Sequence, residues 1–363
     1  MLFLIIILSI YFTTISILVY GFSKVKTFDD LNLTPKTAFT IVVPFRNEAE
    51  NLPLLLDSIS RLNYPMDLIE MILVNDASTD KFQIPNSKFQ ISVINNIRIS
   101  NSPKKDAITT AIKMVKTNWI ITTDADCIVH KNWLLTLDNY IQNHATSMIA
   151  GAVTYNNNNS FLHHFQQLDL ASLQGATIGS FGIGKGFMCN GANLAYKKSL
   201  FLELNGFEGN DTIASGDDVF LLQKALTKFP DKVHYLKSEN TIVTTKALND
   251  WKSLFYQRVR WASKTSSYQS NFGKILGLVV FSGNSSLLLI SYYLLFGIED
   301  FYSLLFLIIT KFLIDYILIY KTNQFLNSKI HYFLASSLLY PIFSVSVALY
   351  SITGKYEWKG RRF

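Results

Sequence analysis

The sequence has only two cysteines, Cys127 and Cys189, and neither belongs to a CxxC pair. This argues against a disulfide framework and a CxxC metal site, so we expect two reduced, buried thiols. Residues 182–196 are rich in glycine, but they lack the Lys-Ser/Thr ending of a phosphate-cradling loop and the spacing of a dinucleotide site. No nucleic-acid-binding module accompanies the formal net charge of +7. An anionic membrane surface and an anionic substrate are therefore the partners that explain the basic charge.

Long apolar runs lie at both ends of the 363-residue chain. Residues 2–20 contain no charge, and the run is long enough to cross the ~30 Å core of a bilayer as a helix. No basic residue precedes this run and no small-residue cleavage site follows it, so we expect a retained anchor and not a signal peptide. Three further runs of spanning length, at residues 275–297, 301–320 and 332–350, lie near the C-terminus.

Charged residues beside these runs predict the side of the membrane on which each part lies. Lys24 and Lys26 follow the first run, which places the chain after them on the cytoplasmic side of a cell (inner) membrane. The acidic turn at residues 299–300 fits the outside, and the basic turn at residues 321–331 fits the inside. The basic C-terminal tail would then lie outside, against the tendency, unless the last run, which contains Pro341, is a re-entrant hairpin. Both possibilities stay open.

We therefore divide the chain into five segments. They are an N-terminal anchor (1–21), a linker (22–37), a cytoplasmic α/β domain (38–271), C-terminal transmembrane segments (272–351) and a basic tail (352–363). Lys311 and Asp315 stand four residues apart inside a predicted span, where each charge costs about 2.5–3.5 kcal/mol on insertion scales. We expect the two side chains to pair on one face of that helix.

The segment between the membrane runs alternates between strand and helix patterns. Residues 39–45 and 69–75 are continuous apolar strands, and a helical repeat of leucine and isoleucine separates them. Strand, helix, strand in this order indicates a parallel sheet, and ligands of such sheets bind beyond the carboxyl ends of the strands. Arg46, Glu48 and Asp76 follow these two strands, so we expect them at the ligand-binding edge.

Asp124 and Asp126 end a third apolar strand at residues 119–123. Alternate side chains of a strand share a face, so both carboxylates can point into one pocket. Two carboxylates this close favour a hard divalent cation that carries a phosphate. The alternative is that both residues only cap the following turn.

Four more polar clusters are expected near the same edge or beside it. Lys104 and Lys105 begin a helix, where their charge opposes the helix dipole unless an anion binds there; solvated surface lysines are the alternative. The loop at residues 190–193 (Asn-Gly-Ala-Asn) lets backbone approach a ligand. Asp217 and Asp218 precede an apolar helix, and two acids exceed the need for a cap, so one could accept a proton.

The fourth cluster lies in the last helix before the membrane, at residues 251–261. Gln257, Arg260 and Trp261 fall on one face of this helix. A cation beside an aromatic ring suits a diphosphate and a sugar ring. A basic, aromatic face lying on lipid headgroups would look the same.

Taken in order, these motifs resemble those of membrane-bound family 2 glycosyltransferases with the GT-A fold, of the ceramide-glucosyltransferase-like group with a Gln-x-x-Arg-Trp signature. The matching stretches are Val43-Pro-Phe-Arg-Asn-Glu48, Val74-Asn-Asp76, Asp124-Ala-Asp126, Asn190-Gly-Ala-Asn193, Gly216-Asp-Asp218, Gln257-Arg-Val-Arg-Trp261 and the tail Trp358-Lys-Gly-Arg361. The resemblance covers nearly the whole chain. It implies an α/β GT-A domain with a mostly parallel sheet, flanked by transmembrane helices.

The resemblance also implies an activity and a role for each matching residue. It implies inverting, hexosyltransferase-type transfer from a nucleotide-diphospho-sugar, with a UDP-linked donor favoured, to a membrane lipid or glycan. Asp126, helped by Asp124, would hold Mg²⁺ or Mn²⁺, and Asp218 would be the general base beside Asp217. The remaining donor-binding residues would be Pro44, Arg46, Glu48, Asp76, Lys104, Gln257, Arg260 and Trp261, and the acceptor side would hold Asn190, Gly191, Asn193 and again Trp261. One departure is the pair Asp217-Asp218, because many members have Glu-Asp there.

Two other functions share parts of this pattern. A processive polysaccharide synthase carries the same Gln-x-x-Arg-Trp signature, but three or four spans give little material for a polymer conduit. A non-catalytic membrane scaffold would not need Asp124, Asp126 and Asp218 together. We therefore favour single transfer to a membrane lipid.

Overall fold

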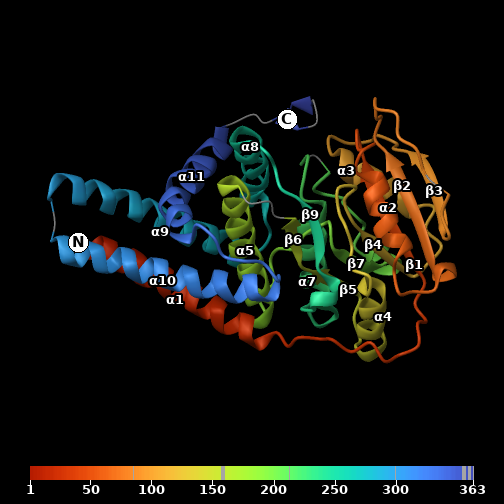
Figure 1. Ribbon diagram of the computed structural model, residues 1–363, viewed down its shortest axis with the longest axis horizontal. Coiled ribbons are helices and arrows are strands. Elements are labelled where there is room, and N and C mark those ends of the chain that lie inside the picture. Colours follow the sequence, from red (N-terminus) through yellow and green to blue (C-terminus); the bar gives the residue numbers. More distant parts are fainter. Residues whose placement is uncertain are drawn as a thin grey trace. The chain divides into compact units, whose positions relative to one another are not determined.

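The computed structural model describes residues 1–84, 86–156, 160–211, 213–298, 300–353, 357–358 and 361–362, and these form two compact units (Figure 1). The first unit comprises the described residues of Met1–Val25, Asn157–Phe187 and Ala247–Phe363 and consists mainly of helices. The second comprises the described residues of Lys26–Asn156 and Met188–Lys246 and contains the large sheet.

The second unit is built on a seven-stranded sheet with the order β3-β2-β1-β4-β7-β5-β8. β1 pairs in parallel with β2 on one side and β4 on the other, and β7 runs antiparallel between β4 and β5. This mostly parallel sheet confirms the α/β fold expected from the sequence. The strands are β1 (Phe39–Phe45), β2 (Ile69–Asn75), β3 (Gln90–Asn95), β4 (Trp119–Thr122), β5 (Met148–Gly151), β7 (Leu194–Lys197) and β8 (Val233–Leu236).

Helices connect these strands and cover the sheet. They are α2 (Leu52–Ser60), α3 (Pro103–Ile112), α4 (Trp133–Asn143), α6 (Lys198–Glu203) and α7 (Asp217–Lys228). The core of the unit includes Ile41 and Val43 of β1, Leu55 of α2 and Trp133 of α4, all nearly inaccessible to solvent. Apolar strands buried on both faces are what a parallel sheet requires, which is why β1 reads as an uninterrupted hydrophobic run.

The apolar run at residues 148–155 has the length of one strand, but the structure divides it in two. β5 ends at Gly151, and β6 (Val153–Asn156) pairs instead with β9 (Val243–Lys246) in a separate two-stranded sheet. The cause lies between them, because the carbonyl of Ala152 accepts hydrogen bonds from the Val243 amide and from the side chain of Asn193. These bonds take Ala152 out of the large sheet.

The first unit is a bundle of six helices, counted over the described residues. They are α1 (Leu2–Lys24), α5 (Phe161–Gly182), α8 (Trp251–Ala262), α9 (Asn271–Phe296), α10 (Phe301–Phe325) and α11 (Phe333–Thr353). α1, α9, α10 and the Phe333–Ile352 part of α11 are long and apolar enough to cross a membrane. Of the predicted basic tail, Ile352 and Thr353 end α11, and Glu357–Trp358 (β10) pairs with Arg361–Arg362 (β11). Gly354, Lys355, Tyr356, Lys359, Gly360 and Phe363 lie outside the described residues, as does Glu299 of the predicted acidic turn.

α1 and α5 touch at their backbones near one end. A Cβ atom added to Gly179 would lie 2.4 Å from the carbonyl oxygen of Leu18, and one added to Gly182 would lie 1.8 Å from that of Gly21. Only glycine fits at such a distance. Small residues are the usual means by which helices of a membrane bundle pack closely.

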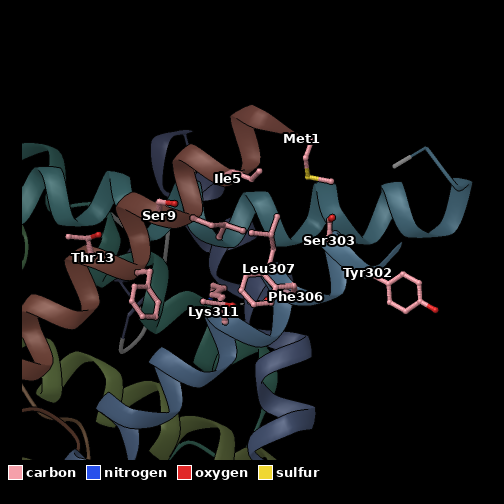
Figure 2. Close-up of a pocket in the computed structure, with 12 residues that line it drawn as sticks. Met1, Ile5, Ser9, Thr13, Tyr302, Ser303, Phe306, Leu307 and Lys311 are labelled. Carbon is pink, nitrogen blue, oxygen red and sulfur yellow. Dashed lines mark hydrogen bonds between the residues drawn. The ribbon is translucent and has the colours of Figure 1, made fainter. Parts of the chain in front are cut away.

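The predicted pairing of Lys311 and Asp315 is confirmed. Lys311 Nζ lies 2.6 Å from Asp315 Oδ2, and the hydroxyl of Tyr11 on α1 donates to the other carboxylate oxygen at 2.7 Å. Lys311 also borders a cavity of ≈ 660 Å³ between α1 and α10, together with Ser9 and Thr13 (Figure 2). Pairing relieves the cost of placing two charges inside an apolar helix bundle.

Candidate active site

The carboxyl ends of β1, β2 and β4 meet at one edge of the sheet. The register aligns Phe45 with Asn75 and Val42 with Thr122, so the residues after each strand become neighbours. The guanidinium of Arg46 donates to the carbonyls of Asp76 and Ala77 at 2.8 and 2.7 Å. The loops after β1 and β2 are thereby fixed to each other, as expected for a parallel sheet.

Pro44 and Asp76 occupy this edge for different reasons. Pro44 has no amide hydrogen, and its nitrogen faces the β4 side of β1. Because β4 pairs with β1 only as far as Val42, no hydrogen bond between these strands is lost. Asp76 is buried, and its carboxylate accepts a hydrogen bond at 2.7 Å from Asn96, which follows the edge strand β3. Glu48 lies at the start of α2, where its carbonyl accepts from the amide of Leu52.

Lys104 is the centre of a charged cluster in this unit. Its Nζ atom lies 2.7 Å from Oδ1 of Asp124 and 3.6 Å from Oδ2 of Asp217. Burial lowers the pKa of Lys104, but the carboxylates of Asp124, Asp217 and Asp218 outweigh that effect and hold the pKa above its usual range. Lys104 is therefore a permanent cation among three carboxylates.

The neighbouring Lys105 has a different environment. Its side chain is 1% exposed, and Nζ donates to the carbonyls of Asn210 and Ile213 at 2.5 and 3.0 Å. It therefore anchors the loop that leads to Asp217. The alternative of two solvated surface lysines is wrong, because protein oxygens receive both ammonium groups. No sequence pattern identified this carbonyl-binding role.

Asp217 and Asp218 are the first two residues of α7, whereas the sequence predicted them just before the helix. Their surroundings differ. Asp217 is buried beside Lys104, whereas Asp218 is half-buried. Both oxygens of Asp218 receive backbone amides, from Gly191 at 2.9 Å and Val219 at 2.7 Å. These bonds orient the carboxylate and leave acceptor capacity, because a carboxylate offers about four lone-pair sites.

Gly191 brings the 190–193 loop into the same cluster. An added Cβ would stand 3.1 Å from Asp217 Oδ2 and 3.2 Å from Lys104 Nζ, so the backbone passes directly beside the charged groups. Asn190 shapes the loop by accepting the amide of Ala192. The predicted approach of this backbone to a ligand stays a prediction, and the absence of a Cβ is what lets the backbone pass close to these side chains.

Asn193 is used entirely within the fold. It is 3% exposed, it accepts the indole hydrogen of Trp133 at 3.1 Å, and it donates to the carbonyls of Ala152 and Thr241. Its side-chain polar atoms thus tie the loop at residues 190–193 to neighbouring segments of the fold. The expectation that it contacts an acceptor stays a prediction, and the geometry assigns it a supporting role.

Asp124 and Asp126 fit the chemistry of a divalent cation. The Asp124 side chain is 40% exposed and Asp126 is half-buried, so carboxylate oxygens at the strand end reach the surface. Mg²⁺ is commonly held by one or two carboxylates, with phosphates and water completing its shell. The described residues contain no cluster of three or more His, Cys, Asp or Glu able to hold a metal by themselves. Two carboxylates assisted by a diphosphate agree with both observations.

Cys127 and Cys189 are free, buried thiols, which confirms the expectation for both. Burial raises the pKa of Cys127, and the carboxylates of Asp126 and Asp124 raise it further. The thiol therefore stays protonated and serves as a small apolar side chain.

Gln257, Arg260 and Trp261 lie on α8 in the first unit, each half-buried. Between them stands Arg258, which the sequence did not single out and which is only 5% exposed. Arg258 is paired with Asp169 of α5, and it also contacts Gln257 and Trp261. In the sequence, the only sign of this role of Arg258 was that it is a second arginine within the Gln-x-x-Arg-Trp signature.

Comparison with known proteins identifies the class. Residues 40–204 match the family model described as Glycosyl transferase family 2. Within these residues the chain carries a family 2 glycosyltransferase domain with the GT-A fold, and this domain indicates a glycosyltransferase enzyme. A comparison with curated proteins gives no match.

Three solved structures superpose on this chain to different degrees. The mannosyltransferase PcManGT from Pyrobaculum calidifontis, in complex with GDP-Man and Mn²⁺, superposes with a TM-score of 0.61 at 14% identity, over 96% of this chain and 98% of that chain. TarS 1-349 from S. aureus with UDP-GlcNAc gives 0.43 at 13% identity, over 89% and 95% of the two chains. Glucosyl-3-phosphoglycerate synthase from Mycobacterium tuberculosis with Mn²⁺, UDP and glucosyl-3-phosphoglycerate gives 0.43 at 16% identity, over 63% and 79%. The first of these supports the GT-A fold over nearly the whole chain.

Proposed function

We propose that this glycosyltransferase moves a sugar, with inversion, from a nucleotide-diphospho-sugar to a membrane lipid, assisted by Mg²⁺ or Mn²⁺. The observation that carries the proposal is the cluster of Lys104, Asp124, Asp217, Asp218 and the Gly191 backbone at the carboxyl edge of the sheet. It combines a fixed cation, carboxylates for a metal and an oriented carboxylate for a proton in one place. The PcManGT structure, with its GDP-Man and Mn²⁺, supports the donor class and the metal.

The donor side of the reaction needs positive charge. The sugar leaves with a diphosphate, and the negative charge that develops there must be stabilised. Lys104 supplies a cation that does not titrate in the physiological range, since its pKa is raised. Asp124 and Asp126 would hold the divalent cation, which when bound supplies further positive charge to the leaving diphosphate. Arg46, Glu48, Pro44 and Asp76, along the same edge, would line the nucleotide.

The acceptor side needs a base. Asp218 is half-buried and its carboxylate is oriented by two backbone amides, so it can accept the proton of an incoming hydroxyl. Asp217 is buried beside Lys104 and serves to hold that cation. The geometry therefore supports Asp218 as the base on grounds beyond the resemblance. Asn190 and Gly191 would face the acceptor.

The signature helix α8 would complete the site. Gln257, Arg260 and Trp261 suit a diphosphate and a sugar ring, and we propose that they close over the donor and the acceptor region. Four helices able to span a membrane support a multi-pass protein whose acceptor is a lipid. We propose that the protein lies in the cell (inner) membrane with its sheet-containing unit in the cytoplasm.

A transfer assay with four donors tests the proposal. Purified protein in membranes receives labelled UDP-glucose, UDP-galactose, UDP-GlcNAc or GDP-mannose, and lipid is then separated from polymer. We expect label from one donor in the lipid fraction, and less without divalent metal. Label in polymer would favour the processive synthase, and no incorporation from any donor would favour the non-catalytic scaffold.

A further inference from the structure

Asp169 of α5 and Arg258 of α8 form a buried ion pair within the first unit. Asp169 Oδ2 lies 2.5 Å from Arg258 Nε, and both side chains are 5% exposed. Figure 1 shows the two helices beside each other with α11 next to them. Two charges withdrawn from solvent persist only when each compensates the other, so the position of Arg258 depends on Asp169.

Arg258 transmits this constraint to the signature. One terminal nitrogen of its guanidinium donates to Oε1 of Gln257, and its Cζ lies 4.2 Å from the ring centroid of Trp261. The first bond orients the amide of Gln257 and leaves its NH₂ group to donate, which suits phosphate oxygens. The second contact holds one face of the Trp261 indole by a cation–π interaction.

The surroundings keep the pair in place. Leu162 and Phe165 of α5 pack with Leu254 of α8 in a buried apolar cluster, to which Phe343 of α11 adds its ring. Tyr340 of α11 packs against the same cluster. Side chains of α5, α8 and α11 thus pack together in one buried cluster.

We propose that Asp169 is a positioning residue for glycosyl transfer. It holds Arg258, and Arg258 in turn fixes the side chains of Gln257 and Trp261 for the donor. The proposal rests on the proposed function, because it assigns the signature helix to donor binding. It adds a carboxylate of the helix bundle to the residues on which transfer depends, although that carboxylate does not touch the substrate.

A double-mutant cycle tests this pathway. Asp169→Asn, Arg258→Met and the double variant are compared with wild type in lipid transfer and in thermal unfolding in micelles. We expect Asp169→Asn to lower kcat/KM on the order of 10²-fold, chiefly by raising the donor KM, because a displaced side chain costs about that much. In the Arg258→Met background, adding Asp169→Asn should change neither kcat/KM nor the donor KM, since the arginine through which Asp169 acts is already absent.

Two further variants separate positioning from a general loss of structure. Asp169→Glu retains the charge and should return KM toward the wild-type value. Gln167→Leu is the matched control, because Gln167 is a fully buried polar residue of the same helix that bonds to Asn323 of α10. We expect it to lower thermal stability while KM stays unchanged.

The outcomes distinguish this proposal from the function on which it rests. If wild type transfers sugar but Asp169→Asn has a normal donor KM, Asp169 does not position the signature. The same conclusion follows if Asp169→Asn lowers transfer equally in the wild-type and Arg258→Met backgrounds. If the single Asp169→Asn variant fails to fold, Arg258→Met alone decides, because a normal donor KM in that variant would show that the ion pair does not position the signature. If wild type transfers no sugar from any donor, the proposed function fails instead.

Discussion

The Nζ atom of Lys104 lies 2.7 Å from Oδ1 of Asp124. The carboxylates of Asp124, Asp217 and Asp218 raise the pKa of Lys104. Replacing this lysine by methionine leaves the three carboxylates without that cation. We expect Lys104→Met to lower transfer by about 10²–10³-fold, the cost of removing one preorganised electrostatic contact. Lys113→Met, at the exposed end of the same helix, is the control and should behave as wild type.

The raised pKa of Lys104 also predicts a pH profile. Its charge stabilises the fold fully below the unfolded value of 10.5, and this contribution disappears only as the pH rises through the higher folded value. Titration of Lys104 should therefore produce no decline in transfer between pH 7 and 9. If wild type and the other variants lost activity between pH 7 and 9 while Lys104→Met did not, Lys104 would be losing its proton in that range. That outcome would contradict the raised pKa of Lys104.

Asp217 and Asp218 are adjacent, but we expect their substitutions to act differently. Asp218→Asn removes the base, and its single carbonyl oxygen can still accept one of the two backbone amides that orient Asp218, so transfer should fall by about 10²–10⁴-fold with donor binding retained. Asp217→Asn removes a partner of Lys104 and should weaken donor binding. Single-turnover transfer and equilibrium binding of the donor nucleotide distinguish the two. Retained transfer in Asp218→Asn would exclude it as the base.

Asp126 is expected to act through the metal. Asp126→Ala should lose the metal-dependent part of nucleotide binding, because one of two carboxylate ligands is gone. The measurement is the Kd of the nucleoside diphosphate with Mn²⁺ and with EDTA, by calorimetry. A variant whose Kd responds to EDTA as the wild type does would leave Asp126 with only a capping role.

The sequence predicted best those features that depend on local pattern. β1 and β2 have the predicted bounds, since short apolar runs rich in β-branched residues favour buried strands of such a sheet. The edge cluster was also predictable, because topology places strand ends together. The pair Asp169–Arg258 was not, since two charges of distant segments carry no periodic signal. The same holds for Asn193, whose three hydrogen bonds join segments far apart in the chain.

The close contact between α1 and α5 predicts sensitivity to a single methyl group. A Cβ at position 179 would lie 2.4 Å from a backbone carbonyl of Leu18, which cannot rotate away. Gly179→Ala should therefore separate the two helices and lower the unfolding temperature in detergent, whereas Gly277→Ala should not, because its Cβ would make an ordinary contact at 3.6 Å. Equal unfolding temperatures of the two variants would contradict the packing described here.

His164 gives the first unit a dependence on acid. Burial lowers its pKa, and the neighbouring His331 and His163 lower it further; the rings of His164 and His331 lie 4.7 Å apart. The fold therefore favours the neutral imidazole, so stability is fully present above the unfolded value of 6.5 and declines as the pH falls below it. We expect the unfolding temperature of wild type to drop between pH 7.5 and 5.5 by more than that of His164→Phe. His130 and His234, whose pKa values are also lowered, remain in both proteins and cancel in the comparison. An identical drop in both would show that His164 takes up its proton equally in the folded and unfolded chain.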